Sequence, residues 1–351
     1  MASLRDYLQM SVERNASDVF IVAGGPVGIK VGGKIEPADD IRLMPDMTGE
    51  LIKETYAMAG RNMDKLIQTG DDDFSFAVGG LARFRVNAYQ QRGSLAAVIR
   101  IVSFSIPDYK KMGIPENIMN LSELTYGMVL VTGTAGSGKS TTQACIVDRV
   151  NHTRNCHIIT LEDPIEFLHR DDESIVSQRE IAIDTQDFLS ALRSCLRQAP
   201  DVIQLGELRD AETIRTAMTA AETGHLLIAT LHTKGAVNTV DRIIDTFPAD
   251  QQGQIRIQLS SVLRTVVCQQ LLPKKDGGLV PAFEIMNMTN AVKSMIRDNK
   301  THQINNVIAA GAADGMISMN QSILALYKQG LITKETALEY CDNPEQLQRL
   351  L

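Results

Sequence analysis

The run Gly133-Thr134-Ala135-Gly136-Ser137-Gly138-Lys139-Ser140 constrains the fold of this chain more than any other feature. It follows the apolar segment Met128–Thr132, which predicts a buried strand, and precedes a segment that predicts a helix beginning near Lys139. Glycines allow backbone N–H groups to turn inward, and a helix N-terminus carries a positive partial charge. This strand, loop and helix therefore predict a cradle for phosphate groups.

Each residue of this run, with Thr141 after it, is a candidate nucleotide-binding residue. A lysine at the position of Lys139 reaches the β- and γ-phosphates, and a hydroxyl at the position of Ser140 ligates Mg²⁺. The motif therefore predicts ATP and Mg²⁺ as the ligands of this chain.

The chain of 351 residues is too long for one ordinary core and predicts two domains. Pro107, Gly113 and Pro115 mark a linker at 106–120. Before it, alternating apolar residues around Gly79-Gly80 predict an antiparallel hairpin, so 1–105 is expected to be an α+β domain. After it, short apolar runs alternate with helical stretches, which predicts a parallel α/β core over 121–290. Residues 291–351 are expected to be helical.

Several individual elements follow from spacing. Leu4, Leu8 and Val12 predict an opening helix, and 47–68 is expected to form one further helix. Apolar residues at 259, 263, 267 and 271 recur every four positions and predict another helix, with helix continuing to the C-terminus.

Acidic residues follow two of the predicted core strands. Glu162 ends the run from His157, and Glu207 follows the run Asp201–Leu205. In α/β sheets the carboxyl ends of the strands border the ligand, so both acids are expected beside the phosphate loop. In a common P-loop pattern, an aspartate stands at the position that Gly206 occupies here. Glu207 is therefore the residue left to help hold the metal ion.

His225 and His232 flank the predicted strand Leu226–Thr230. Their spacing of seven is not the i, i+4 spacing of a helical zinc pair. We expect these histidines to sense phosphate. A structural role, in which the imidazole forms a hydrogen bond to the backbone, is an equal alternative for each.

The charge and the cysteine content argue against several other classes of protein. The formal net charge of −7 and the absence of tryptophan argue against stable nucleic-acid binding. Five cysteines without a C-x-x-C pair encode neither a disulfide framework nor a four-thiolate zinc site. The first residues lack the basic-then-apolar order of a secretion signal, so we expect a cytoplasmic protein.

Four stretches together, 133–140, 159–167, 201–210 and 219–233, resemble the Walker A, Asp box, Walker B and His box of the secretion-superfamily ATPases. Within that group the chain is most similar to the PilT-type pilus retraction ATPases. The resemblance also covers Gly80–Asn87 and Lys300–Ile304. It implies a PAS-like N-terminal domain, a RecA-like core and a homohexameric ring at the inner face of the cell membrane. The ring would reach the membrane only through partners, namely a pilus platform protein.

The resemblance also implies residue roles. Glu162 corresponds to the base that orients the attacking water, and Glu207 to the Mg²⁺ ligand. Arg83 and Arg85 correspond to arginines that reach the phosphates; the alternative for each is a solvated strand face. His232 belongs to the His box.

Three alternative functions remain open. The family motif A-I-R-N-L-I-R differs at Lys293 and Ser294, which leaves an accessory retraction paralogue possible. A pilus assembly or type II secretion ATPase shares the same core. Pilus extension ATPases typically carry a tetracysteine zinc insert, and this sequence has none. A RecA-like DNA translocase shares the loop and ring, but the charge disfavours it.

Overall fold

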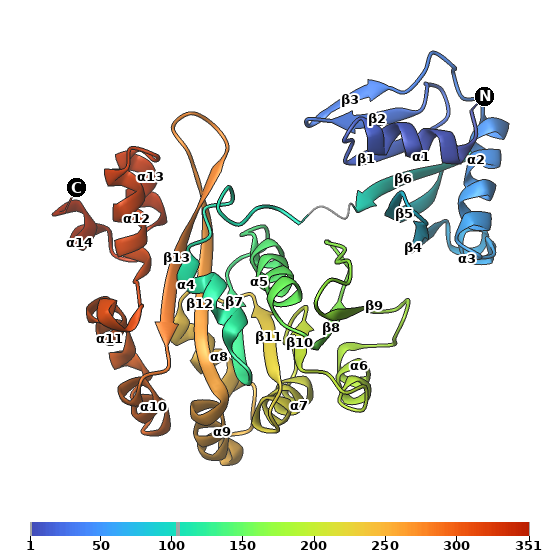
Figure 1. Ribbon diagram of the computed structural model, residues 1–351. Coiled ribbons are helices and arrows are strands. Elements are labelled where there is room, and N and C mark those ends of the chain that lie inside the picture. Colours follow the sequence, from blue (N-terminus) through green and yellow to red (C-terminus); the bar gives the residue numbers. More distant parts are fainter. Residues whose placement is uncertain (1, 103–105, 351) are drawn as a thin grey trace. The chain divides into compact units, whose positions relative to one another are not determined.

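A computed structural model describes residues 2–102 and 106–350. Residues 2–102 form a first compact unit, and residues 106–165 with 169–350 form a second (Figure 1). The expected end of the first domain at 105 lies outside the described residues. Among the described residues, no helix has the length and apolar character needed to cross a bilayer.

Within residues 2–102, six strands form one antiparallel sheet in the order β3-β2-β1-β6-β5-β4. The helices pack on it through a core that includes Leu8, Leu51, Phe84 and Ile99. The elements are α1 (Leu4–Glu13), β1 (Asp18–Ile21), β2 (Gly28–Val31), β3 (Lys34–Pro37), α2 (Pro45–Met58), α3 (Asp64–Thr69), β4 (Asp71–Val78), β5 (Ala82–Gln91) and β6 (Ser94–Val102). The expected opening helix and hairpin are confirmed.

Residues 47–68 do not form one helix, as the sequence suggested. Helix α2 ends at Met58 and α3 begins at Asp64. Gly60 between them has a φ of +63°, a left-handed conformation that terminates helices. The apolar period continues through this break, so spacing alone did not reveal it.

Within residues 106–350, seven strands form a second sheet in the order β13-β12-β7-β11-β10-β8-β9. All neighbours run parallel except β12 and β13. The strands are β7 (Gly127–Thr132), β8 (His157–Glu162), β9 (Ile175–Glu180), β10 (Val202–Leu205), β11 (Leu226–Leu231), β12 (Leu263–Pro273) and β13 (Leu279–Asn287). This confirms the expected parallel α/β core.

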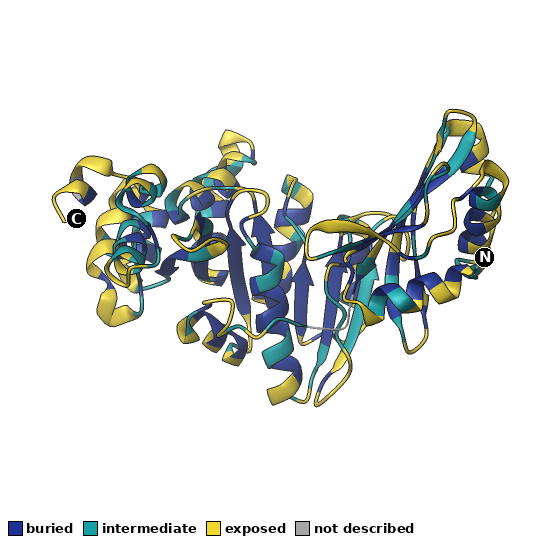
Figure 2. Cartoon of the chain, turned by 90° about the horizontal axis from the view of Figure 1, so that it is seen from above, coloured by how far each residue is buried: buried dark blue, intermediate teal, exposed yellow. Residues whose placement is uncertain are grey.

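Both faces of the second sheet are covered. Alternate residues of β7 point to opposite sides: Val129 and Val131 pack with α5, while Met128 and Leu130 pack with the helices of the other face. The central strands β7, β10 and β11 are buried along their whole length, and Figure 2 shows buried strands in dark blue at the middle of the sheet. The helices are α4 (Glu116–Met119), α5 (Lys139–Thr153), α6 (Phe188–Cys195), α7 (Ala211–Glu222), α8 (Ala236–Asp245) and α9 (Ala249–Val262), with a short 3-10 turn at Asn120–Glu123.

The segment 106–120, expected as a linker, is grouped with the second unit. Its apolar residues Ile114, Ile118 and Met119 are buried in the core that also contains α5. The breakers Pro107, Gly113 and Pro115 therefore shape a segment that packs against the second unit from its start.

The C-terminal part differs from expectation. The helix expected over 259–271 is wrong beyond Val262, because residues 263–273 form β12 between β7 and β13. A spacing of four fits one strand face as well as one helix face, since four is a multiple of two. The β-branched run Thr265-Val266-Val267 favours the strand.

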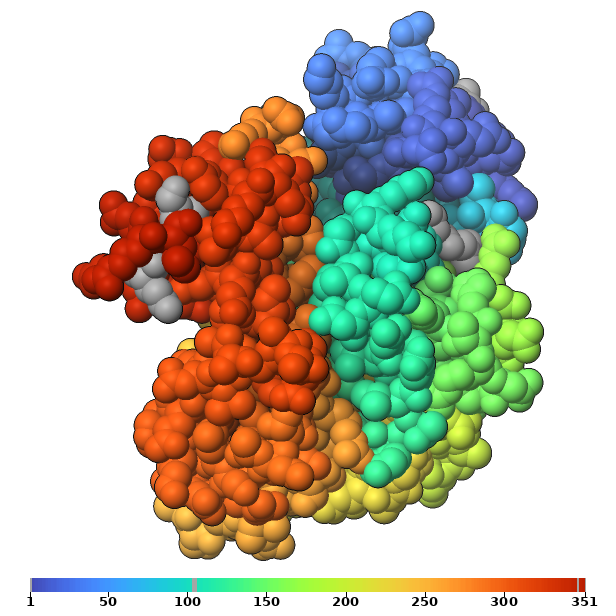
Figure 3. Space-filling view, turned by 60° about the vertical axis from the view of Figure 1, so that its left-hand side comes forward, coloured from blue at the N-terminus to red at the C-terminus, as the bar shows by residue number. Residues whose placement is uncertain are grey.

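Helix does not follow directly after residue 271 either, because β13 lies before the helical region, whereas the expectation of helices over 291–351 agrees with the structure. That region contains α10 (Asn290–Arg297), α11 (Ile304–Ala310), α12 (Met319–Lys328), α13 (Lys334–Tyr340) and α14 (Pro344–Gln348), with short 3-10 turns at Thr301–Gln303 and Ala312–Asp314. These helices lie beside β13, and Figure 3 shows them in orange to red, gathered on one side of the second unit.

Candidate active site

The glycine-rich loop joins the end of β7 to the start of α5, as the sequence predicts. Gly133, Gly136 and Gly138 all have left-handed φ angles, of +143°, +75° and +86°. A Cβ on Gly133 would lie 2.3 Å from the backbone oxygen of Gln269 on β12. The loop thus needs glycine at Gly133 for both its conformation and its close approach to β12.

Lys139 is the first residue of α5, and its ammonium group is turned back over the loop. Its Nζ donates to the carbonyl oxygens of Gly133, at 3.0 Å, and Thr134, at 2.8 Å. The residue is only 8% exposed, so these contacts fix a positive charge inside the loop.

The remaining loop residues fit a phosphate chain. The buried hydroxyl of Ser137 has no hydrogen-bond partner within the described chain, which leaves a donor for a ligand oxygen. Thr134, Ala135 and Gly136 are exposed at the tip, and Ser140 and Thr141 are half-buried in the first turn of α5. A nucleotide with a hydroxyl-ligated Mg²⁺ is compatible with this arrangement.

A cavity of about 540 Å³ borders the tip of this loop. On the loop side it is lined by Thr134 to Ser137, and on the far side by Tyr340, Cys341 and Asp342 from the C-terminal region. Burial raises the pKa of Asp342, and the positive charge of Lys234 opposes that rise. The C-terminal region therefore forms one wall beside the candidate phosphate site, which no local sequence pattern indicated.

Glu162 ends β8 on the same edge of the sheet as the loop, because β7, β11, β10 and β8 are adjacent and parallel. Its Oε1 accepts hydrogen bonds from Thr160 Oγ1, at 2.5 Å, and Gln178 Nε2, at 3.1 Å. The residue is 8% exposed, and these two hydrogen bonds fix the orientation of its carboxylate at the sheet edge.

Glu207, His232 and Lys139 form a continuous polar line. His232 Nε2 lies 3.3 Å from Glu207 Oε2, and His232 Nδ1 lies 3.5 Å from Lys139 Nζ. Arg209 forms an ion pair with the other oxygen of Glu207, and this partner raises the pKa of the Arg209 guanidinium. No sequence motif indicates a role for Arg209, although it stands two residues after Glu207.

His225 does not join this group within one chain. Leu226 of β11 pairs with Gly127, whereas Leu231 pairs with Thr132, directly before the loop. Six strand residues of about 3.3 Å each place His225 roughly 20 Å away, at the opposite edge. Its Nδ1 instead lies 2.9 Å from the Ala220 carbonyl oxygen, as the structural alternative requires.

Arg83 and Arg85 lie on β5 of the first unit, with their side chains on the face opposite Phe84. Arg85 is exposed and Arg83 is half-buried. Arg85 pairs across the strands with Arg100, whose side chain binds Asp18 at 3.0 Å. The role of the two arginines at a phosphate remains a prediction.

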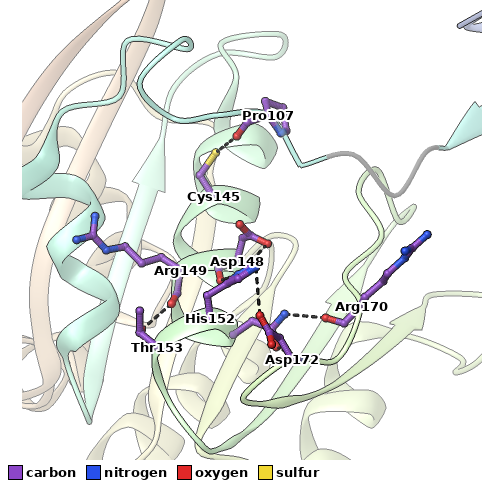
Figure 4. A network of polar contacts seen from close by, with 9 residues as sticks. Pro107, Cys145, Asp148, Arg149, His152, Thr153, Arg170 and Asp172 are labelled. Atoms are coloured by element: carbon purple, nitrogen blue, oxygen red, sulfur yellow. Dashed lines mark hydrogen bonds and ion pairs between the residues drawn. The ribbon is translucent and has the colours of Figure 1, made fainter.

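Helix α5, which begins at Lys139, is anchored by polar contacts between its middle and its C-terminal end (Figure 4). Cys145 Sγ donates to the Pro107 carbonyl oxygen at 3.3 Å, and His152 Nε2 lies 3.3 Å from Asp172. A backbone hydrogen bond to Asp148 is the main factor that raises the pKa of His152. Helix α5 is therefore tied to neighbouring loops as well as to the core beneath it.

A glycine loop on a helix N-terminus, beside acids at the ends of parallel strands, defines a P-loop nucleotide-binding protein. The model of the family "Type II/IV secretion system protein" matches residues 2–330, and the chain belongs to that family. The expected α/β class with an N-terminal α+β domain is confirmed.

Individual relatives are similar over nearly the whole chain. The type IV pilus retraction ATPase PilT of Pseudomonas aeruginosa is 41% identical over 97% of this chain and 99% of its own. The type IV pilus ATPase PilU of the same organism is 37% identical over 98% of this chain and 90% of its own. A crystal structure of the pilus retraction motor PilT with bound ADP matches with a TM-score of 0.90 and 44% identity, over 99% of this chain and 100% of that one. These similarities support ATPase activity.

Proposed function

We propose that this chain is the ATP-hydrolysing motor of type IV pilus retraction, and that it works as a homohexamer at the inner face of the cell membrane. The observation that carries the proposal is the convergence of Lys139, His232, Glu207 and Glu162 at one sheet edge beside the loop. The names of the relatives supply the link to the pilus.

In the proposed hydrolysis Glu162 is the general base. Its carboxylate, oriented by Thr160 and Gln178, takes a proton from the water that attacks the γ-phosphorus. The bond from that phosphorus to the bridging oxygen breaks, and ADP and phosphate leave. Lys139 balances charge on the phosphate oxygens.

Glu207 and Ser140 are the proposed holders of Mg²⁺, which when bound would neutralise phosphate charge. His232 keeps Glu207 and Lys139 in register by contacting both. Arg83 and Arg85 of the first unit are proposed to complete the phosphate site, so that loss of the γ-phosphate releases one unit from the other.

Force is proposed to reach the pilus through a platform protein in the membrane, so the motor needs no membrane contact of its own. The formal charge of −7 favours a basic partner surface and disfavours stable nucleic-acid binding. Binding of DNA that persists in a salt titration would argue instead for a translocase.

Features of α10 favour a second candidate, an accessory retraction ATPase. Lys293 and Ser294 replace an arginine and an asparagine of the retraction motif, and Arg297 Nη2 donates to Ser294 Oγ at 3.1 Å. Arg297, the last arginine of the motif, therefore contacts a residue of its own helix.

Two experiments test the proposal. Phosphate release from ATP should require Mg²⁺ and should vanish in Lys139→Ala, whereas Mg²⁺-independent or unchanged turnover would refute the enzyme. Deletion in a piliated host should give abundant fibres without surface motility. Bald cells would instead indicate pilus assembly, and normal motility would indicate an accessory role.

A further inference from the structure

A buried carboxylate lies behind the loop that carries His232. Glu284 is on β13 and is only 5% exposed. Its Oε1 accepts a hydrogen bond of 2.7 Å from the backbone N–H of Ala236, the first residue of α8. The residue before it, Gly235, has no side chain with which to cap this helix. Another element of the fold therefore supplies the cap.

Glu284 is held in a buried setting that disfavours its charge. Burial is the main cause that raises the pKa of Glu284, the charge of Asp342 adds to that rise, and the hydrogen bond from Ala236 opposes it. The start of α8 is therefore the partner that favours the carboxylate form.

The segment held by this contact is short. Four residues, from His232 to Gly235, connect the end of β11 to α8. Thr239 fixes the same turn from within α8, because its Oγ1 donates to the Gly235 carbonyl oxygen at 2.8 Å and lies 2.7 Å from Thr233 Oγ1. Such a short connection has little slack, so a shift of the α8 N-terminus would move His232 as well.

We propose that Glu284 is a positioning residue for ATP hydrolysis, which holds the start of α8 so that His232 stays between Lys139 and Glu207. The inference rests on the proposed function. It assigns no contact between Glu284 and the nucleotide: Glu284 acts through the turn and His232.

A double-mutant cycle separates this role from simple stabilisation. Glu284→Gln keeps the size of the side chain, but it removes the negative charge that faces the positive N-terminus of α8 and replaces one acceptor oxygen by an NH₂ donor. With His232 displaced by about 1 Å, kcat should fall tenfold or more, with the KM for ATP within about twofold. In a His232→Ala background, Glu284→Gln should cause little further loss.

Thr289→Ala is the matched control. Thr289 caps α10 through Val292 N, at 3.4 Å, so its loss should lower the melting temperature but leave kcat unchanged. Full turnover in Glu284→Gln, or an equal further loss in the His232→Ala background, would overturn the inference. If the wild-type protein in the same assay releases no phosphate, the proposed function itself fails instead.

Discussion

Alanine substitutions along the glycine loop provide a graded test of its geometry. Gly133 and Gly136 both have positive φ angles, but only Gly133 has close neighbours: its Cβ would lie 2.3 Å from Gln269 O and 2.6 Å from Ser137 Oγ. No atom would lie within 4 Å of a Cβ on Gly136. The two substitutions therefore share backbone strain and differ in steric overlap.

The expected magnitudes follow from these contacts. Left-handed backbone costs an alanine about 1–2 kcal/mol, and this is the whole cost at Gly136. At Gly133 the Gln269 oxygen belongs to the backbone of β12, which is paired with both β7 and β13 and cannot easily move. Overpacking of this kind adds about 1–3 kcal/mol, giving roughly 2–5 kcal/mol in total.

Calorimetric titration with ADP measures the effect without turnover. An alanine-substituted loop relaxes in the free protein and must return to the glycine conformation around the phosphates, so the cost appears in binding. Because every 1.4 kcal/mol changes Kd about tenfold, Gly136→Ala should weaken binding about 5- to 30-fold and Gly133→Ala at least about 30-fold. Gly253→Ala is the matched control, since Gly253 lies inside α9 with open space around it. That change should leave Kd unaltered and raise stability by about 0.5–1 kcal/mol.

Equal Kd values for Gly133→Ala and Gly136→Ala would refute the reasoning, because the approach of β12 would then have no effect on the loop. Thermal unfolding of each variant shows whether any loss of binding merely reflects loss of folded protein.

Three further predictions concern other parts of the second unit. Glu162→Gln should bind ATP normally but hydrolyse it at least about 100-fold more slowly, as measured by single-turnover phosphate release, and near-normal turnover would reject the general base. Thr142→Val should lower the free energy of unfolding by about 1–3 kcal/mol, because the buried Gln269 Oε1 loses its 2.7 Å donor; an unchanged urea midpoint would show that the bond contributes nothing. Burial raises the pKa of the Cys145 thiol to about 12 and that of the Cys195 thiol to about 11. Mass spectrometry after alkylation at pH 8 should therefore find these two thiols unmodified until urea is added. The half-buried Cys156 should react first.

The candidate active site links three separate stretches of the chain. Lys139 comes from the loop, Glu207 follows β10 and His232 follows β11. The imidazole of His232 lies 3.5 Å from the ammonium of Lys139 and 3.3 Å from the carboxylate of Glu207. Because His232 contacts both residues, its position can affect the ammonium group of Lys139 and the candidate metal ligand Glu207 together. This is why a residue behind the His232 turn, Glu284, is expected to affect turnover.

The sequence by itself determined the loop and its neighbours, because that information is local. Eight contiguous residues specify the turn, and the apolar run before them forms a strand that is buried on both faces. It also indicated the acids at the strand ends, since carboxyl ends of parallel strands share one edge.

Tertiary structure alone decided which of the candidates meet. The order of strands places β11 beside β7 with a register that brings His232 to the loop and leaves His225 at the far edge. No local period encodes strand order, and a repeat of four residues is compatible with helix and strand alike, which is why β12 was mistaken for a helix. The approach of Gln269 to Gly133 and the cap that Glu284 gives to α8 both depend on that strand and its partner β13, so they became visible only in the folded chain.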